Sequence, residues 1–451
     1  MTDPIAYDAQ PRRPAWGVRT PLRKSLSTRV PLLVAPPPAV VCISLAQSPG
    51  VAARATVVPG QQVHCGEPIG EPVEDGGPRV HASISGQVTH VERRLVAGLE
   101  DPVPCVVIQG TGADERWPGY TPDPEAATRP AQDLQERIAA AGLIGLGGAL
   151  FPTARKLKAA AGAPVLLLNG AECEPYISCD DMLIRERADC VVAGGRLLLA
   201  ALGAQRCVIA VKTDMPKARV ALYNAIEAAG DVRLVMSVVT AKYPAGGERQ
   251  LIELVLGREV PAGGHPADVG VLCQNVATAA AAADFFLRGQ PLISRIVTVS
   301  GGGVRQPRNI EARIGTPVAE LIALAGGYMA GGYQQEPRRL IMGGPMMGVA
   351  LASDELPITA ATNCLIAATA SDLGSDQREM PCIRCGDCIE ACPASLLPQE
   401  LLVAVRVGNA AELATLGVTE CIECGACDYV CPSHIPLTHH FIRGKAALVA
   451  P

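Results

Sequence analysis

The chain has 451 residues, 49% hydrophobic but only 3% aromatic, so its cores must be built from Ala, Val, Leu and Ile, and its length predicts two to four domains. Its 39 Lys and Arg residues against 44 Asp and Glu residues give a net charge of -5, which offers no broad basic surface and argues against a nucleic-acid partner. The start lacks the pattern of a secretion signal, and glycines and arginines interrupt the apolar stretch at 190–211, so we expect a cytosolic chain with a buried helix and strand there.

The first predicted element is an all-β module at about residues 55–90. VVPGQQVHCGEPIG and VHASISGQVTHV read as short alternating strands separated by glycine turns. The pattern resembles the barrel-sandwich hybrid of lipoyl and biotinyl carriers, which present a modifiable lysine at a hairpin tip. The corresponding tip, around Ser83 to Gly86, has no lysine. A structural or docking module is therefore favoured over a carrier.

From Gln132 onward, helical segments alternate with apolar strands such as PVLLLNG and RCVIAVK, which predicts an α/β domain with a partly parallel sheet. The segment GLIGLGGALFPTARKLKAA places a glycine run before an amphipathic stretch that contains Lys156 and Lys158. Such a loop can turn tightly and direct amides at a phosphate at a helix start. Glycine-rich loops also serve close packing alone, and both interpretations stay open on this segment.

Polar loops follow several of the predicted strands. NGAECEPYISCDD at 169–181 is dense in carboxylates and comes directly after an apolar strand, which is where α/β sheets bind ligands; a solvated acidic loop is the alternative. YPAGGERQL at 243–251 and VLCQNVATAAA at 271–281 repeat the pattern of a polar loop that opens an apolar helix.

Residues 292–330 predict strand, turn, strand and helix, which resembles a small β-grasp ligand-binding module. Its turn at 300–303 is interpreted as a plain hairpin. IMGGPMMG at 341–348 adds another glycine turn before the last domain.

Eight of the seventeen cysteines fall in two copies of the run CxxCxxCxxxCP, at 382–393 and 421–432. In this motif three thiolates bind one [4Fe-4S] cluster, and the fourth, before proline, binds the other cluster. The rule predicts one cluster on Cys382, Cys385, Cys388 and Cys431 and a second on Cys392, Cys421, Cys424 and Cys427. Two zinc sites would leave the third and fourth positions unexplained. The other nine cysteines are expected to be inert core residues.

These motifs, in this order, resemble the RnfC family, a component of the Rnf complex, which is a membrane-bound oxidoreductase that couples electron flow between ferredoxin and NAD to ion transport. The resemblance covers nearly all of the chain and rests on GLGGALFPTARKL, NGAECEPYISCDD, YPAGGERQLI, GREVPAGGHPADVGVLCQNVAT, IMGGPMMG and the doubled cysteine run. Residues 132–285 also look like the flavin- and NADH-binding subunit of respiratory complex I.

The resemblance implies FMN and NADH as ligands of the α/β domain, and it assigns residues to them. Gly145, Gly147, Gly148 and Lys156 would face the FMN phosphate and ribityl chain. Asn169, Glu172 and Glu174 would lie by the isoalloxazine and the NADH ribose. Tyr243, Gly246, Glu248, Asn275 and Thr278 would close the pocket. Hydride transfer needs no acid or base from the protein, so no catalytic proton donor is named.

Two features depart from the family pattern. Relatives usually read GGAGF where this chain has Leu150, whose side chain would crowd the nucleotide. The related complex I protein ends in a single-cluster motif, which a two-cluster domain replaces here.

The resemblance also implies an organisation and a role. We expect a barrel-sandwich module at 1–130, an FMN- and NADH-binding α/β domain at 131–290, a β-grasp module at 291–350 and a two-cluster ferredoxin-like domain at 351–451. The implied role is that of a peripheral subunit, on the cytoplasmic face of the bacterial inner membrane, of an ion-translocating NADH:ferredoxin oxidoreductase. Its partners would be integral and ferredoxin-like subunits, with ferredoxin or flavodoxin reached indirectly.

Two alternatives remain at this stage. One is an electron-transfer and docking scaffold with a vestigial nucleotide pocket, which Leu150 favours. The other is a cobalamin-reductase-like flavoprotein, in which the β module would follow the flavin domain, whereas here it precedes.

Overall fold

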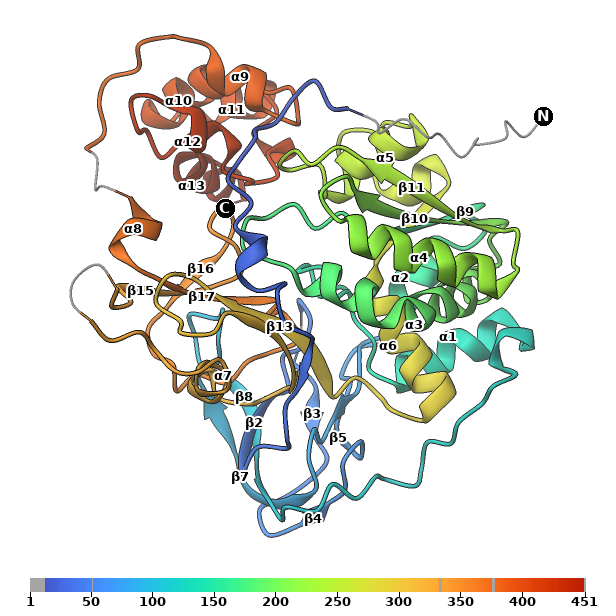
Figure 1. The fold of residues 1–451 in the computed structure, drawn as a ribbon. Coiled ribbons are helices and arrows are strands. Elements are labelled where there is room, and N and C mark those ends of the chain that lie inside the picture. Colours follow the sequence, from blue (N-terminus) through green and yellow to red (C-terminus); the bar gives the residue numbers. More distant parts are fainter. Residues whose placement is uncertain (1–12, 51, 332–334, 375–377, 450–451) are drawn as a thin grey trace.

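The computed structural model describes residues 13–50, 52–331, 335–374 and 378–449. The chain forms a β-sandwich module, an α/β domain, a β-grasp sheet and a helical cysteine domain (Figure 1). This arrangement confirms the predicted multidomain fold class.

The N-terminal module packs a four-stranded sheet, ordered β2-β8-β7-β4, against a three-stranded sheet, ordered β3-β5-β6. Alternate residues such as Val41, Ile43 and Ile108 point between the sheets and form the core. The predicted tip is buried, because Ser83 is fully enclosed and donates to the carbonyl of Ile314 in the β-grasp region. This contact supports a structural module. The strands are β2 (Val40–Ser44), β3 (Arg54–Ala55), β4 (Gln62–Val63), β5 (Pro68–Glu71), β6 (Val80–His81), β7 (Gly86–Arg94) and β8 (Val103–Gly110).

The α/β domain is built on a fully parallel sheet of order β11-β10-β9-β12. Its strands are almost continuously apolar because helices cover both faces. Leu166 and Leu168 face one layer, while Val165 and Leu167 face the other. The strands are β9 (Val165–Asn169), β10 (Arg206–Lys212), β11 (Leu234–Val239) and β12 (Val271–Asn275). The helices are α1 (Ala131–Ala140), α2 (Thr153–Ala159), α3 (Cys179–Leu202), α4 (Pro216–Ala229), α5 (Glu248–Leu256) and α6 (Val276–Arg288).

The β-grasp sheet has six strands in the order β1-β14-β13-β17-β15-β16. It extends beyond residue 350, where the predicted module ends, because β17 pairs in parallel with β13 and completes the middle of the sheet. It also includes β1 from the N-terminal segment, which pairs with β14. The elements are β1 (Leu33–Val34), β13 (Ser294–Ser300), β14 (Arg308–Arg313), α7 (Val318–Leu324), β15 (Arg339–Met342), β16 (Val349–Leu351), β17 (Cys364–Ala368) and α8 (Ala370–Leu373).

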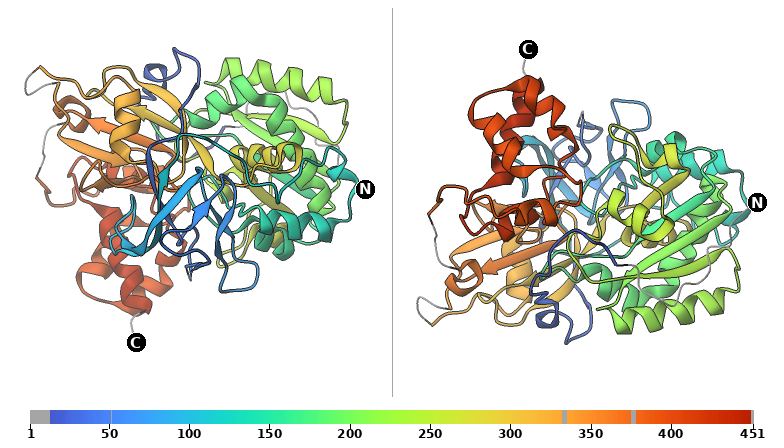
Figure 2. Two further views of the ribbon diagram at one scale, coloured as in Figure 1. Left: turned by 90° about the horizontal axis from the view of Figure 1, so that it is seen from below. Right: turned by 90° about the horizontal axis from the view of Figure 1, so that it is seen from above.

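The cysteine domain consists of short helices around a small core that includes Leu401, Leu413 and Phe441. It projects from the rest of the molecule, with the C-terminus at its outer end (Figure 2). Its helices are α9 (Asp387–Ala391), α10 (Pro398–Arg406), α11 (Ala410–Thr415), α12 (Ala426–Val430) and α13 (Leu437–Val449). Among the described residues, none of the helices combines the length and the apolar character that a membrane crossing requires.

Candidate functional site: a polar cavity beside two rings of cysteines

A cavity of about 470 Å³ lies at the carboxyl end of the parallel sheet. Asn169 ends β9 and Asn275 ends β12, and the two residues are paired in the strand register, so both project at the same edge. The Asn275 side chain donates to the carbonyl of Asn169 at 3.3 Å and caps α6 by accepting from Ala277 at 2.7 Å. This edge is the usual ligand site of a doubly wound sheet, and the volume suits a nucleotide-sized ligand.

The glycine loop forms one wall of the cavity through Gly145 and Gly147. Thr278 holds the loop from behind, since its hydroxyl accepts from the amide of Leu146 at 2.9 Å and donates to the carbonyl of Ile144 at 3.2 Å. A Cβ on Gly147 would come within 3.3 Å of Asn275. The loop therefore follows the sheet edge closely and leaves the space in front of it free.

Charged side chains line the opposite part of the cavity. Lys156, on α2, forms an ion pair with Glu248, the first residue of α5, at 2.5 Å, and both remain partly exposed to the cavity. Asn169 donates to the carbonyl of Gly246 at 2.8 Å, which fixes the loop before α5. A Cβ on Gly246 would lie 2.2 Å from the carbonyl of Ala171, so this close approach of two loops requires glycine.

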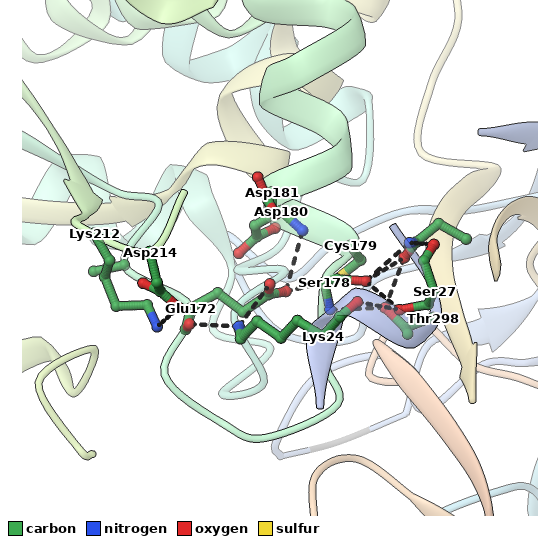
Figure 3. A network of polar contacts seen from close by, with 12 residues as sticks. Lys24, Ser27, Glu172, Ser178, Cys179, Asp180, Asp181, Lys212, Asp214 and Thr298 are labelled. Atoms are coloured by element: carbon green, nitrogen blue, oxygen red, sulfur yellow. Dashed lines mark hydrogen bonds and ion pairs between the residues drawn. The ribbon is translucent and has the colours of Figure 1, made fainter. Parts of the chain in front are cut away.

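A buried polar network lies at the floor of the cavity (Figure 3). Lys24 reaches Glu172 at 3.2 Å, and the Glu172 carboxylate accepts from the amide of Asp180 at 3.1 Å and from the thiol of Cys179 at 3.2 Å. Asn275 donates to Asp180 at 2.7 Å. Burial, together with the charge of Glu172, raises the pKa of Asp180 to about 7. Burial alone would lower the pKa of Lys24, but the Glu172 and Asp214 carboxylates raise it above its usual value.

Glu174 lines the cavity, yet its carboxylate is committed to another segment. Its two oxygens accept the backbone N–H groups of Met346, at 3.2 Å, and Met347, at 2.9 Å. Those residues belong to the IMGGPMMG hairpin between β15 and β16. Burial raises the pKa of Glu174 to about 7 in spite of these two hydrogen bonds.

The structure brings most of the predicted nucleotide residues together. All twelve except Gly148 and Thr278 line the cavity, and Thr278 acts through the glycine loop. Leu150 adopts a positive φ of 53°, and its side chain packs against the domain core, while Ala149 and Phe151 face the cavity. The predicted crowding by Leu150 therefore has no support in the geometry.

Several lining residues were missed in the sequence. Phe151 and Gln274 stand next to predicted residues and carry aromatic and polar side chains, so adjacency could have flagged them. Met347, Asn363 and Ile422 come from distant segments and carried no local signal. Cys173, Cys179 and Cys273 also line the cavity, which corrects the expectation that all nine scattered cysteines are inert core residues.

The eight clustered cysteines form two separate rings. Cys382, Cys385, Cys388 and Cys431 surround one hollow, and Cys392, Cys421, Cys424 and Cys427 surround another. Each ring thus takes its fourth cysteine from the other sequence run. The first ring is the more open, since Cys382 and Cys385 are exposed, whereas Cys424 and Cys427 of the second ring are buried.

The backbone around the rings suits a negatively charged iron-sulfur cluster. The amides of Arg384 and Glu423 donate to the sulfurs of Cys382 and Cys421, each at 3.4 Å. Both residues have positive φ, of 56° and 58°, at equivalent positions of the two runs. Amides aimed at sulfur stabilise cluster thiolates and tune their potential, so the donors present fit [4Fe-4S] clusters.

The cavity and the second ring share a wall. Ile422 lines both hollows. Tyr243, another cavity residue, donates its phenol hydrogen to the carbonyl of Cys424 at 2.5 Å. A ligand in the cavity would therefore lie closer to the second ring than to the exposed first ring.

Family models match the chain in four places. They are described as the RnfC barrel sandwich hybrid domain at 14–113, the Nuo51 FMN-binding domain at 138–284, the SLBB domain at 296–350 and a 4Fe-4S dicluster domain at 381–435. The second match spans the cavity and the last spans the two rings. FMN and two [4Fe-4S] clusters are therefore the cofactors that the matched domains bind.

Known proteins are similar over most of the chain. The RnfC protein of the ion-translocating oxidoreductase complex of Pseudomonas aeruginosa is 44% identical over 96% of this chain and 55% of that protein. The proteins of the same name from Erwinia tasmaniensis and Rhodobacter capsulatus are 40% and 38% identical over 96% of this chain, and over 53% and 82% of their own lengths. The chain spans about half the length of the Pseudomonas and Erwinia relatives.

A solved structure of an NAD+-reducing [NiFe]-hydrogenase in the H2-reduced state aligns with 73% of this chain and 63% of that chain, at 20% identity and a TM-score of 0.47.

Proposed function

The chain belongs to the RnfC family of ion-translocating oxidoreductase complexes, and on that basis we propose that it passes electrons between NADH and the other subunits of such a complex. A bound flavin would accept two electrons from NADH as a hydride and release them singly, which iron-sulfur clusters require. The proposed order is cavity, second cysteine ring, first cysteine ring and then a partner.

The observation that carries this proposal is the wall shared by the cavity and the second ring. Ile422 belongs to both hollows, and Tyr243 connects them by a hydrogen bond to Cys424. The first ring reaches the surface at Cys382 and Cys385, so it is the more accessible to a partner. A nucleotide site alone, or a pair of clusters alone, would not need this contact.

The proposed roles of the cavity residues follow from their chemistry. Lys156 supplies a cation for the flavin phosphate, and Glu248 holds the lysine in place. Asn169 and Asn275 present amides at the sheet edge to the polar rim of the flavin ring. Glu172 is held by Lys24, so a carboxylate faces the nucleotide without leaving an unpaired charge in the floor. Hydride transfer needs orientation from these groups and no proton from them.

The further parts of the proposal come from the family. They are the coupling to ion transport, the ferredoxin that exchanges electrons with NADH through partner subunits, and a peripheral place on the cytoplasmic face of the inner membrane. The chain would attach there through integral subunits.

The test is an anaerobic reconstitution of the full chain with iron, sulfide and FMN. We expect about eight irons and one FMN per chain. NADH should then bleach first the flavin band and next the cluster bands. A chain that holds zinc in the cysteine rings, or one whose bound FMN does not respond to NADH, would contradict the proposal.

A further inference from the structure

The N-terminal segment at residues 14–27, here called the strap, lies between the α/β domain and the cysteine domain (Figure 1). Lys242 donates to the carbonyl of Ala15 at 3.0 Å, which ties the start of the strap to the α/β domain. The amide of Gly17 donates to the carbonyl of Ala391 at 3.1 Å, which ties it to the cysteine domain one residue before Cys392. One short segment thus holds two domains that are far apart in the sequence.

The strap pairs directly with Tyr243. Val18 and Tyr243 exchange two backbone hydrogen bonds, of 2.8 and 2.9 Å. Gly17 permits this pairing, because its φ is 88° and a Cβ there would lie 2.3 Å from the carbonyl oxygen of Tyr243. Position 17 requires glycine for both its backbone conformation and its close approach.

Tyr243 is held at both of its ends. Its backbone is paired with the strap, and its phenol donates to the carbonyl of Cys424 at 2.5 Å. Its side chain is 2% exposed and packs in a small apolar cluster with Val18 of the strap and with Ala391, Cys424 and Ala426 of the cysteine domain. Cys173 and Met346 pack against the same cluster from the cavity side. These residues form the layer between the cavity and the second ring.

We propose that the strap and Tyr243 form a positioning joint that sets the separation between the cavity and the ring of Cys392, Cys421, Cys424 and Cys427, and hence the rate at which electrons cross. This inference rests on the proposed function. One electron crosses at a time: the reduced flavin loses it and the cluster in the second ring gains it, with no bond made or broken at the joint. Tyr243 and Gly17 act by position and by hydrogen bonding, and neither carries the electron.

Three full-length variants test the joint. Gly17→Ala forces the strap away from Tyr243, while Tyr243→Phe keeps the ring and removes only the hydrogen bond to Cys424. Gly60→Ala is the matched control, because Gly60 has a φ of 93° with nothing within 4 Å of an added Cβ, so it introduces the same backbone strain without a clash. Each protein is reconstituted with FMN, iron and sulfide and mixed with NADH in an anaerobic stopped-flow instrument.

We expect flavin reduction by NADH to keep its rate in Gly17→Ala, while cluster reduction slows roughly tenfold, since a shift of about 1 Å between reacting centres has effects of this order. Gly60→Ala should keep both rates. In Tyr243→Phe, an EPR-monitored titration with dithionite should show one of the two clusters at a more negative potential, because a donor near its ligand has been removed. The other cluster should not change.

A readout independent of any cofactor comes from Trp16, which lies in the strap and is one of only two tryptophans in the chain. Trp16 is partly buried against the α/β core. In a Trp117→Phe background, Gly17→Ala should move the Trp16 emission to longer wavelength, and Gly60→Ala should leave it unchanged.

The outcomes separate the two proposals. If NADH fails to reduce the flavin in the wild-type chain, the proposed function is lost, while the dithionite titration still decides the joint. If Gly17→Ala shifts the Trp16 emission but cluster reduction and both potentials match the wild type, or if neither variant changes any readout, the joint is refuted.

Discussion

The carboxylate of Glu174 accepts the backbone N–H of Met347 at 2.9 Å, which connects the loop after β9 to the hairpin between β15 and β16. A Cβ on Gly344 of the same hairpin would come within 2.2 Å of this carboxylate, so the hairpin lies directly on Glu174. The other side of the hairpin contacts the cysteine domain, where the carbonyl of Met346 would lie 3.2 Å from a Cβ on Gly425. Glu174 therefore holds a segment that bridges three domains.

Burial raises the pKa of Glu174 from 4.5 to about 7, and this predicts a dependence of stability on pH. A carboxyl whose folded pKa is raised binds more protons in the folded state, so its contribution is most favourable below the unfolded pKa and declines as the pH rises through 7. Glu174→Gln should flatten the fall in unfolding free energy between about pH 5 and pH 8 by up to about 3 kcal/mol. Urea denaturation across that range measures it.

The control for this prediction is Glu253→Gln on the exposed face of α5, which should leave the slope as it is in the wild type. Glutamine at 174 also places an amide N–H against a backbone N–H, so the variant loses some stability at every pH. The slope, and not the stability at one pH, is therefore the quantity to compare. An unchanged slope in Glu174→Gln would contradict the assignment.

The ion pair between Lys24 and Glu172 gives a second prediction. Both side chains are less than a tenth exposed, and Lys24 also donates to the carbonyl of Glu172 at 2.7 Å. Lys24→Met leaves a buried carboxylate without its cation, which should lower the unfolding free energy by about 3–5 kcal/mol. The double variant with Glu172→Gln should recover part of that loss.

Lys158 provides the matched control for Lys24. It lies 3.9 Å from Asp75, and both side chains are largely exposed. Lys158→Met should change stability by no more than about 0.5 kcal/mol. Equal losses for Lys24→Met and Lys158→Met in urea denaturation would show that the buried pair does not stabilise the fold.

The local motifs explain how much could be predicted from the sequence. The cysteine runs, the glycine loop and the strand ends at Asn169 and Asn275 are each determined by neighbouring residues, and the structure brings them together. Continuous apolar strands likewise predicted a parallel sheet covered on both faces, and the observed sheet is fully parallel.

Contacts between distant segments could not be predicted in this way. Lys24 and Glu172 are 148 positions apart, and Tyr243 and Cys424 are 181 apart, so nothing in either local sequence identifies the partner. The same reason explains Glu174, which was expected to face the nucleotide and instead has both oxygens occupied by the hairpin. Leu150 was judged by its size, but its positive φ directs the side chain toward the core.

The proposed role of Lys156 predicts a loss of flavin affinity. Hydrogen bonds to charged groups contribute about 1.5–3 kcal/mol, so Lys156→Met should weaken FMN binding roughly tenfold to a hundredfold. Arg155, on the same helix, pairs with Glu74 at 3.3 Å in the N-terminal module, so Arg155→Met is a control of equal charge change. Quenching of FMN fluorescence by the apoprotein measures both affinities. Equal weakening by the two variants would place the phosphate elsewhere.

The crossed arrangement of the two cysteine rings gives the last prediction. Cys431 belongs to the second sequence run but lines the first ring, and Cys392 belongs to the first run but lines the second ring. Cys431→Ser should therefore abolish the same EPR signal as Cys385→Ser, and Cys392→Ser the same signal as Cys424→Ser. Each variant should fall from about eight to about four irons per chain.

Cys190→Ser is the control for this series, because Cys190 is buried in α3 at a distance from both rings in the sequence and should leave about eight irons. The stronger comparison is between variants of the same run. If each run held its own cluster, Cys431→Ser would match Cys424→Ser and not Cys385→Ser. That pattern would contradict the crossed rings, and with them the position of the second ring as the one that faces the cavity.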